Sequence, residues 1–349
     1  MNDAVASRMI IIGGGPAGYT AALYGARARL EPICIEGYAA GGQIARSGQI
    51  DNFPGFPGGI AGADLGERIR TQAMDFGAVM RTEEVESVDL TGPTFRVATA
   101  DHEYEAESVI VATGAQPRRL DMPSEDEYEG RGVCYCAICD GPFFAGQRVV
   151  VVGGGDAAVE EAIALSNIAS SVVLVHRRRE FRASATSLAA LGSTAKIRVH
   201  TPAVVSEILG EELGVTGVRV RDLDTGTESV LPADGVFVAI GHDPANGLFT
   251  KWLDIDDYGY LRATAGSTAT RIPGVFVAGD IADPRYRQAI TASASGCAAA
   301  IDAERWLVGR RGAQAMAARG AMVDVDARNT GLGADQLSTD EEKAAQASA

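Results

Sequence analysis

Long apolar runs are missing from this sequence. None reaches the roughly 18 to 20 residues that a membrane span needs, so we expect a soluble protein with no membrane partner. The start also lacks the basic stretch and cleavage site of a signal peptide and runs directly into Gly13, which predicts a first β-strand. Cysteine is scarce, with 5 in 349 residues. This argues against a structural disulfide framework, so we expect a cytoplasmic protein in which any disulfide is catalytic.

Basic residues are outnumbered, with 31 Lys and Arg against 46 Asp and Glu and a formal net charge of −15. An acidic surface repels phosphate, so nucleic acid is not an expected partner. Glycine, by contrast, is abundant at 42 residues, and 46% of all residues are hydrophobic. This composition is typical of a compact α/β protein with many tight turns. The length is sufficient for two domains, each with its own core.

Buried-strand and helix patterns alternate along the chain. The strands are predicted at residues 9–12, 31–36, 108–113, 148–152, 171–175, 235–240 and 274–278, and the helices at 17–28, 157–167 and from 288 to about 308. The order predicts two Rossmann-like, doubly wound, three-layer domains, one inserted into the other. The first comprises residues 1–117 and 248–311, the second residues 118–247, and the crossings at Pro117 and 244–247 suit hinges. Residues 312–349 are expected to be largely disordered.

The first glycine motif, Gly13-x-Gly15-x-x-Gly18, follows a predicted strand and opens a helix. Such a turn lets backbone N–H groups approach a pyrophosphate at the positive end of the helix. Glu36 ends the next strand, where a carboxylate accepts a hydrogen bond from a ribose hydroxyl and repels a 2′-phosphate. The motif therefore predicts a dinucleotide site; the alternative is a plain glycine-rich turn in a sheet.

A second motif, Gly153-x-Gly155-x-x-Ala158, has the same context but no acid at the end of its following strand. That position is His176, and four arginines follow it: Arg177, Arg178, Arg179 and Arg182. A guanidinium group suits a phosphate, so this site is predicted to prefer NADPH to NADH. The alternative is a solvated basic loop. A flavin dinucleotide in the first site and NADPH in the second is the economical pairing.

A dithiol, Cys136 and Cys139, lies just before the second glycine motif. Its spacing favours a lowered pKa in one thiol and predicts thiol–disulfide exchange, with Asp140 able to move the proton that exchange requires. Metal binding is the competing interpretation, because Cys134 adds a third sulfur; tetrahedral zinc needs a fourth ligand, and no histidine is near in sequence. Cys134 is then a buried or spare thiol, and Cys34 and Cys297 are expected in the core.

Taken in order, these segments resemble the low-molecular-weight, bacterial-type thioredoxin reductases over roughly residues 8–310. The matching stretches are IIGGGPAGYTAALYGARA, GGQI, VATGA, CAICDG, VVVGGGDAAVEEA, HRRREFRA, AIGHDPAN and GVFVAGDIADPRYRQAITASASGCAAA. The resemblance implies FAD, NADPH, a homodimer and thioredoxin as the protein disulfide substrate.

The resemblance also assigns cofactor contacts residue by residue. For FAD they are Gly13, Gly15, Pro16, Ala17, Gly18, Glu36, Gly42, Gln43, Asn52, Thr113, Gly114, Gly279, Asp280, Arg287, Gln288 and Ala289. Of these, Asp280 meets the ribityl chain and 287–289 lie against the flavin. For NADPH they are Gly153, Gly155, Asp156, Ala157, Ala158, His176, Arg177, Arg178 and Arg182. Arg131 and the pair Phe143 and Phe144 match the positions at which the family docks its protein partner.

The implied mechanism is that of a thioredoxin-disulfide reductase. NADPH gives a hydride to FAD, and two electrons then pass to the disulfide, with Cys139 facing the flavin and Cys136 attacking thioredoxin. Asp140 protonates the leaving thiolate. The dithiol cannot lie against the flavin and also meet a protein disulfide, so the inserted domain is expected to rotate about its hinges.

The larger glutathione-reductase-like enzymes are excluded on sequence grounds. They carry the dithiol soon after the first glycine motif and a catalytic histidine near the C-terminus. Here the GGQI stretch has no cysteine and the last histidine is His242, so the acid–base role falls to Asp140 by default.

Departures from the family pattern are few. Ile138 stands between the cysteines where the family usually has a threonine or similar polar residue, Cys134 is an extra thiol, and the tail is longer. The alternatives are a dithiol oxidase that gives electrons to oxygen, a ferredoxin-fed flavoprotein and a redox-sensing binding protein.

Overall fold

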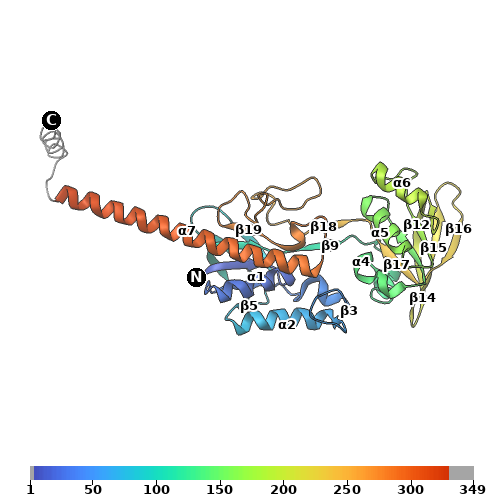
Figure 1. The fold of residues 1–349 in the computed structure, drawn as a ribbon, viewed down its shortest axis with the longest axis horizontal. Helices are drawn as coiled ribbons and strands as arrows, with labels where there is room; N and C mark the ends of the chain where they lie inside the picture. Colours follow the sequence, from blue (N-terminus) through green and yellow to red (C-terminus); the bar gives the residue numbers. More distant parts are fainter. Residues whose placement is uncertain (1–3, 330–349) are drawn as a thin grey trace, which may run out of the picture.

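The computed structural model describes residues 4–329 (Figure 1). A first sheet has the strand order β5-β2-β1-β8-β7-β6, with β19 also paired to β8. Its parallel members are β1 (Val5–Ile12), β2 (Ile33–Ile35), β5 (Val79–Arg81), β8 (Glu103–Val111) and β19 (Val275–Val277). The strands β6 (Val85–Asp89) and β7 (Phe95–Thr99) extend it in antiparallel sense. The runs of Ile and Val in β1 and β8 are buried because layers cover both faces of this sheet.

Helix α1 (Pro16–Arg27) packs along α7 (Ala289–Asn329), and their small residues form one core with one face of the sheet. Helix α2 (Gly62–Asp75) lies beside α1. The short elements η1 (Gly42–Arg46) and β4 (Ile60–Ala61) contact α2, and β3 (Gln49–Ile50) pairs with β4 in antiparallel sense. Residues of β6, β7, Phe249 and Leu253 form the core on the opposite face.

A second sheet is entirely parallel, in the order β10-β17-β11-β12-β13. These strands are β10 (Val133–Cys134), β17 (Gly235–Val238), β11 (Arg148–Val152), β12 (Ser171–Val175) and β13 (Ile197–His200). Helices α4 (Ala137–Asp140), α5 (Asp156–Ser166) and α6 (Ala185–Ser193) contribute to the core on one face, together with η2 (Gly141–Phe144). The other face is covered by an antiparallel meander of β14 (Ala203–Glu211), β15 (Gly214–Asp222) and β16 (Glu228–Pro232).

The two sheets occupy separate lobes in Figure 1, and the chain passes between them twice. The crossing segments pair with each other as β9 (Ala115–Pro117) and β18 (His242–Pro244), in antiparallel sense. After the first crossing, α3 (Pro123–Tyr128) leads into β10. The fold is therefore three-layer α/β with Rossmann-like units, as predicted; the third layer of the second unit is a β-meander.

The C-terminal region differs from our expectation. We predicted a helix ending near residue 308 and disorder from 312, whereas α7 continues to Asn329. The sequence of 312–329 is rich in alanine, the best helix former, and this propensity outweighs the polar composition on which we relied. Residues 330–349 lie outside the described part. Among the described helices, including α7, none combines the length and hydropathy of a membrane span.

Candidate active site

The first glycine turn has the geometry that a close backbone approach requires. Gly13 has a φ of +120°, and a Cβ there would lie 2.2 Å from the carbonyl oxygen of Ala112. A Cβ on Gly18 would lie 1.8 Å from the carbonyl oxygen of Gly13. Helix α1 then starts at Pro16, with Gly15 as its N-cap. Side chains are thus excluded where the strand β1 turns into α1, which leaves backbone N–H groups at the start of the helix.

Glu36 is almost fully buried, 4% exposed, at the end of β2. Its carboxylate accepts hydrogen bonds from Tyr19 Oη at 2.8 Å, Thr82 Oγ1 at 2.9 Å, and Arg70 Nε and Nη2 at 2.8 and 3.0 Å. Burial alone would raise the pKa of Glu36, but the hydrogen bonds from Arg70, Thr82 and Tyr19 outweigh it and hold the pKa below its ordinary value. Glu36 therefore stays ionised and can act as a hydrogen-bond acceptor at the end of β2.

Sequence reasoning missed Arg70, which α2 places against Glu36. Its guanidinium forms two bonds with one carboxylate, the strongest geometry available to such a pair. No local motif marks this arginine, because the helix that carries it follows a stretch of short strands and turns.

Asp280 provides a test of whether this region fits FAD. It lies in η3 (Gly279–Ile281), beside α1: a Cβ on Gly279 would lie 2.8 Å from the Cβ of Ala17. Among the described residues Asp280 Oδ1 is buried without a hydrogen-bond partner. Burial, and then the charge of Asp283, raise the pKa of Asp280 to about 6. A buried acceptor with no protein donor fits a ligand that carries hydroxyl groups, as the ribityl chain of FAD does.

Replacing Asp280 with Leu should weaken FAD binding by about tenfold or more, because a hydrogen bond to a charged group is lost. Asp280→Asn keeps an acceptor at the same place and should lose much less. The FAD content of the purified variants and the Kd of added FAD measure this difference. Equal retention of FAD by the Leu variant and the wild type would contradict the contact.

Hydrogen bonds join polar side chains from segments that are far apart in sequence. Gln43 Nε2 donates to Gln116 Oε1 at 2.7 Å, and Asn52 Nδ2 donates to Gln288 Oε1 at 3.2 Å. Thr113 Oγ1 donates to the carbonyl of Ala245 at 2.8 Å. Four of the residues we predicted as FAD contacts, Gln43, Asn52, Thr113 and Gln288, are thus engaged in contacts between segments far apart in sequence.

The dithiol is an intramolecular disulfide, Cys136–Cys139, with a Cα–Cα distance of 5.3 Å. Cys136 caps the short helix α4, and the backbone N–H of Cys139 donates to its Sγ at 3.2 Å. The other lobe supplies Gln288, whose Oε1 lies 3.7 Å from Cys139 Sγ and whose Nε2 lies 3.7 Å from Cys136 Sγ. The disulfide therefore lies against the segment that we predicted to line the flavin.

Asp140 directly follows Cys139 in sequence and is half-buried. Burial raises the pKa of Asp140 to about 6, and a hydrogen bond with Cys134 partly counteracts that rise. Glu161 of α5 lies nearby; burial raises its pKa to about 7, against the lowering influence of Arg287 and of a backbone hydrogen bond from Ala137. A carboxyl group with a pKa near neutrality can both hold and release a proton at the pH at which the enzyme works.

The second glycine turn repeats the first. Gly153 has a φ of +156°, and a Cβ there would lie 2.3 Å from the carbonyl oxygen of Ala239. His176 lies directly under the turn, because a Cβ on Gly154 would be 2.1 Å from its ring. Burial lowers the pKa of His176, so the ring is neutral and supports the loop. Asp156 accepts from the backbone N–H of Ser184 at 2.8 Å and so ties α5 to the segment after the arginines.

The arginine loop is exposed at the end of β12. Within the described residues Arg179 pairs with Asp224 at 2.6 Å, whereas Arg177, Arg178 and Arg182 have no carboxylate partner. The backbone N–H of Arg182 donates to the carbonyl of Gly154 at 2.8 Å, which anchors the loop to the glycine turn. Three cations are thereby available beside a nucleotide turn, which fits the 2′-phosphate of NADPH.

The prediction that Cys297 lies in the core was wrong, and the two phenylalanines matched to the docking position differ in burial. Phe144, expected in the docking surface, is buried and packs edge to face on Phe237 at 5.3 Å; its neighbour Phe143 is 45% exposed. Cys297, expected in the core, is half-exposed on α7 near Tyr24, while Cys34 is fully buried. Arg131 is exposed and donates to the carbonyls of Glu127 and Glu212 at 2.6 and 3.2 Å. Whether each of these side chains is buried depends on its neighbours in three dimensions, which the local sequence pattern does not reveal.

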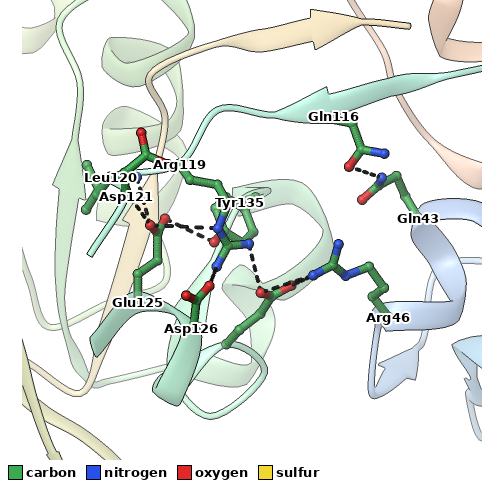
Figure 2. Close-up of polar contacts among 10 residues, drawn as sticks. Gln43, Arg46, Gln116, Arg119, Leu120, Asp121, Glu125, Asp126 and Tyr135 are labelled. Carbon is green, nitrogen blue, oxygen red and sulfur yellow. Dashed lines mark hydrogen bonds and ion pairs between the residues drawn. The ribbon is translucent and has the colours of Figure 1, made fainter. Parts of the chain in front are cut away.

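A chain of charged groups joins the lobes near the first crossing (Figure 2). Arg46 Nη2 of η1 lies 3.2 Å from Glu129 Oε1, and Arg119 Nη1 donates to Glu129 Oε2 at 2.8 Å. Arg119 also pairs with Asp126 at 2.7 Å, and Tyr135 Oη donates to Glu125 at 3.0 Å. Glu129 thus bridges the first lobe and the start of the second.

Comparisons with known proteins identify the family. The profile of the family described as pyridine nucleotide-disulphide oxidoreductase matches residues 7–296. A Mycobacterium leprae protein named bifunctional thioredoxin reductase/thioredoxin is 50% identical over 92% of this chain and 70% of its own length. Among solved structures, thioredoxin reductase from Giardia duodenalis has a TM-score of 0.84 at 39% identity, covering 87% of this chain and 99% of its own.

The thioredoxin reductase of Lactococcus lactis, solved in a form called the FR conformation, covers the same 87% of this chain and 99% of its own. Its identity is 35%, but its TM-score is only 0.60. Together with the matched profile and the glycine, arginine and cysteine geometry above, these relatives show that the chain belongs to the pyridine nucleotide-disulphide oxidoreductases, in their thioredoxin reductase branch, as an NADPH-dependent flavoprotein with a redox-active disulfide.

Proposed function

We propose that this chain reduces the disulfide of a thioredoxin at the expense of NADPH, as a homodimer in the cytoplasm. The observation that carries the proposal is the contact of the Cys136–Cys139 disulfide with Gln288, which joins the dithiol of one lobe to the flavin segment of the other. The flavin, when bound, supplies the conversion of a nicotinamide hydride into two electrons for a disulfide. The residues of the chain position the groups and move the protons.

FAD is held in the first lobe by the turn around Gly13, the carboxylates of Glu36 and Asp280, and the segment 287–289. Two observations support this assignment: the backbone packing at the turn, which excludes side chains, and the Oδ1 of Asp280, which has no hydrogen-bond partner among the described residues. NADPH is held in the second lobe by the turn around Gly153 and by the arginine loop. The strand β2 is followed by the carboxylate of Glu36, whereas β12 is followed by the arginines. This difference in charge directs each dinucleotide to its own site.

The two sulfurs have different roles. Cys139 accepts electrons on the flavin side, and Cys136 is the nucleophile toward thioredoxin. The N–H of Cys139 donates to Cys136 Sγ, which stabilises a thiolate there once the disulfide is open. When Cys136 attacks the thioredoxin disulfide, the S–S bond of thioredoxin breaks, and Asp140 in its acid form gives its proton to the thiolate that leaves and becomes a carboxylate.

The surface beside the disulfide suits a protein partner. Ile138, between the two cysteines, is 68% exposed, and Phe143 is 45% exposed. Exposed apolar side chains next to a reactive disulfide favour docking of a protein over a small charged thiol. In the Mycobacterium leprae relative, a thioredoxin is named as part of the same polypeptide.

The domain division and its motion belong to the same proposal. Residues 118–247 form an inserted NADPH domain, and 1–117 with 248–311 form the FAD domain. The hinges are β9 and β18, the paired segments through which the chain crosses. The unequal TM-scores of 0.84 and 0.60 at similar identity support two arrangements of these domains within the family.

The test of the function is NADPH-dependent reduction of a thioredoxin disulfide, with NADH as the comparison. Replacing Arg177 and Arg178 together by Ala should raise the KM for NADPH by about tenfold or more, because charge-assisted hydrogen bonds are lost. The KM for NADH should not change. Arg179→Ala is the matched control, since Arg179 is already paired with Asp224. Equal efficiency of the two nucleotides in the wild type would overturn the NADPH assignment.

A further inference from the structure

The carboxylate of Glu36 receives as many hydrogen bonds from the described residues as its two oxygens can accept. Oε1 accepts from Thr82 Oγ1 at 2.9 Å and from Arg70 Nη2 at 3.0 Å, whereas Oε2 accepts from Tyr19 Oη and from Arg70 Nε, both at 2.8 Å. An ionised carboxylate offers about four acceptor positions. A ribose hydroxyl can therefore bind Glu36 only by displacing one of these donors, so a simple acceptor role does not explain the arrangement.

One of these donors, Tyr19, connects Glu36 to the first glycine turn. Tyr19 is fully buried, and its Oη also accepts from the backbone N–H of Gly41 at 3.1 Å. The next residue, Gly42, lies directly against the turn, because a Cβ on Gly42 would be 3.0 Å from the Cα of Gly15. The hydrogen bonds from Glu36 through Tyr19 therefore help to hold this segment against the turn at which a pyrophosphate is expected.

The charge of Glu36 is balanced by Arg70. The Glu36 side chain is 1% exposed, and Arg70 is its salt-bridge partner within the described part of the chain; a buried carboxylate without such a partner is costly. Glu36 also adjoins the glycine turn, because a Cβ on Gly14 would lie 2.5 Å from its Cβ. The diphosphate of FAD is negatively charged, so an unpaired carboxylate at this place would oppose its binding. The other acidic neighbour of Arg70, Glu67, is exposed and 3.8 Å away, so it competes little for the guanidinium.

We propose that Arg70 is a positioning residue for FAD and that it acts through Glu36. Its guanidinium balances the negative charge of the carboxylate beside the glycine turn and fixes both carboxylate oxygens, one of which holds Tyr19. Glu36 then contributes to FAD binding through its protein partners rather than as a free acceptor for ribose. The inference rests on the FAD site proposed above and concerns binding alone.

The test is the Kd of FAD, measured by the change in flavin fluorescence when FAD is added back to the full chain after its removal. Arg70→Met should raise this Kd by about tenfold or more, because a buried carboxylate is left unpaired near a negatively charged ligand. Arg70→Lys keeps the charge but cannot bond to both oxygens in the same way, so its increase should be smaller. Arg68→Met is the matched control: Arg68 is on the same helix but lies over the ring of Phe56, and its loss should leave the Kd unchanged.

A double-mutant cycle with Glu36→Gln shows whether Arg70 acts through Glu36. In the Glu36→Gln background no carboxylate is left to be balanced, so adding Arg70→Met should change the Kd of FAD by less than about threefold. The double variant should also bind FAD more tightly than Arg70→Met alone. Equal losses from Arg70→Met in both backgrounds would overturn the proposal. This comparison remains available if Arg70→Met alone fails to fold, because the double variant has no unpaired charge.

The Tm of the FAD-free variants separates positioning from packing. Arg70→Met with a lower Tm but the wild-type Kd for FAD would show that Arg70 only stabilises the fold, which would overturn the proposal. If the wild-type chain bound no FAD, the FAD site itself would fail. If the wild type binds FAD and Asp280→Leu weakens that binding while Arg70→Met does not, the FAD site stands and only the role of Arg70 fails.

Discussion

Replacing Cys139 with Ser should reduce thioredoxin-disulfide reduction by on the order of a thousandfold or more, as expected when a covalent participant is removed. The disulfide cannot form without both sulfurs, so electrons have no route from the flavin to the protein substrate. Cys136→Ser should have the same effect, because the nucleophile is lost. Steady-state oxidation of NADPH with thioredoxin as acceptor measures both variants.

Both variants should still bind FAD and be bleached by NADPH, since the cysteines lie outside the first lobe. The glycine turn, Glu36 and Asp280 all belong to elements of the first sheet and its helices, whereas Cys136 and Cys139 belong to α4 of the second lobe. The visible spectrum before and after anaerobic NADPH records this. Loss of FAD along with activity would show that the defect is structural.

Cys297→Ser provides the matched control for these variants. Cys297 is a half-exposed thiol on α7, and the same chemical change there should leave thioredoxin reduction intact. A comparable loss of activity in Cys297→Ser would mean that the losses in the Cys136 and Cys139 variants are not specific to the dithiol.

The parts of the fold that were predictable are those determined by local sequence. Strands 148–152 and 171–175 have the predicted ends because short, Val-rich apolar runs between turn residues favour a buried parallel strand. The glycine turns were equally clear, because the required close approaches at Gly13 and Gly153 tolerate no side chain. Cys136 and Cys139 were identified by their spacing, and the structure joins them.

The parts that were not predictable depend on contacts between distant segments. Arg70 meets Glu36 from another helix, and nothing in its own neighbourhood marks it. Phe143 and Phe144 are adjacent and identical in type, yet only the position of Phe237 makes one of them core. The extent of α7 was underestimated for a different reason: alanine supports a helix without the apolar periodicity that we used as a signal.

A covalent link between the two lobes should abolish turnover while preserving one half-reaction. Arg46 and Glu129 are the sites for it, because their side chains meet across the interface at 3.2 Å (Figure 2). Replacing both by Cys and joining them with a short bis-maleimide fixes the disulfide in its present contact with Gln288. The proposed rotation, which exposes the dithiol and admits the nicotinamide, is then blocked.

The experiment is best done in a Cys297→Ser background with the Cys136–Cys139 disulfide oxidised. Because Cys34 and Cys134 are buried, the maleimide then reacts with the two introduced cysteines. Steady-state thioredoxin reduction should fall almost to zero after crosslinking. Two electrons supplied by dithionite should still open the disulfide, because it remains against the flavin segment. Unfolding should then expose four titratable thiols, Cys34 and Cys134 together with the opened pair, against two without dithionite.

The control for this link is a pair with the same residue types inside one sheet. Arg96 and Glu105 face each other in register on β7 and β8, 3.3 Å apart, within the first lobe. Replacing Arg96 and Glu105 by Cys removes the same two charges as the replacements at 46 and 129. The crosslink then lies within one lobe and leaves the lobes free to move, so activity should survive. If the link between positions 46 and 129 also left full turnover, the lobes would not need to move, and thioredoxin and NADPH would have to reach the active site in the arrangement seen here.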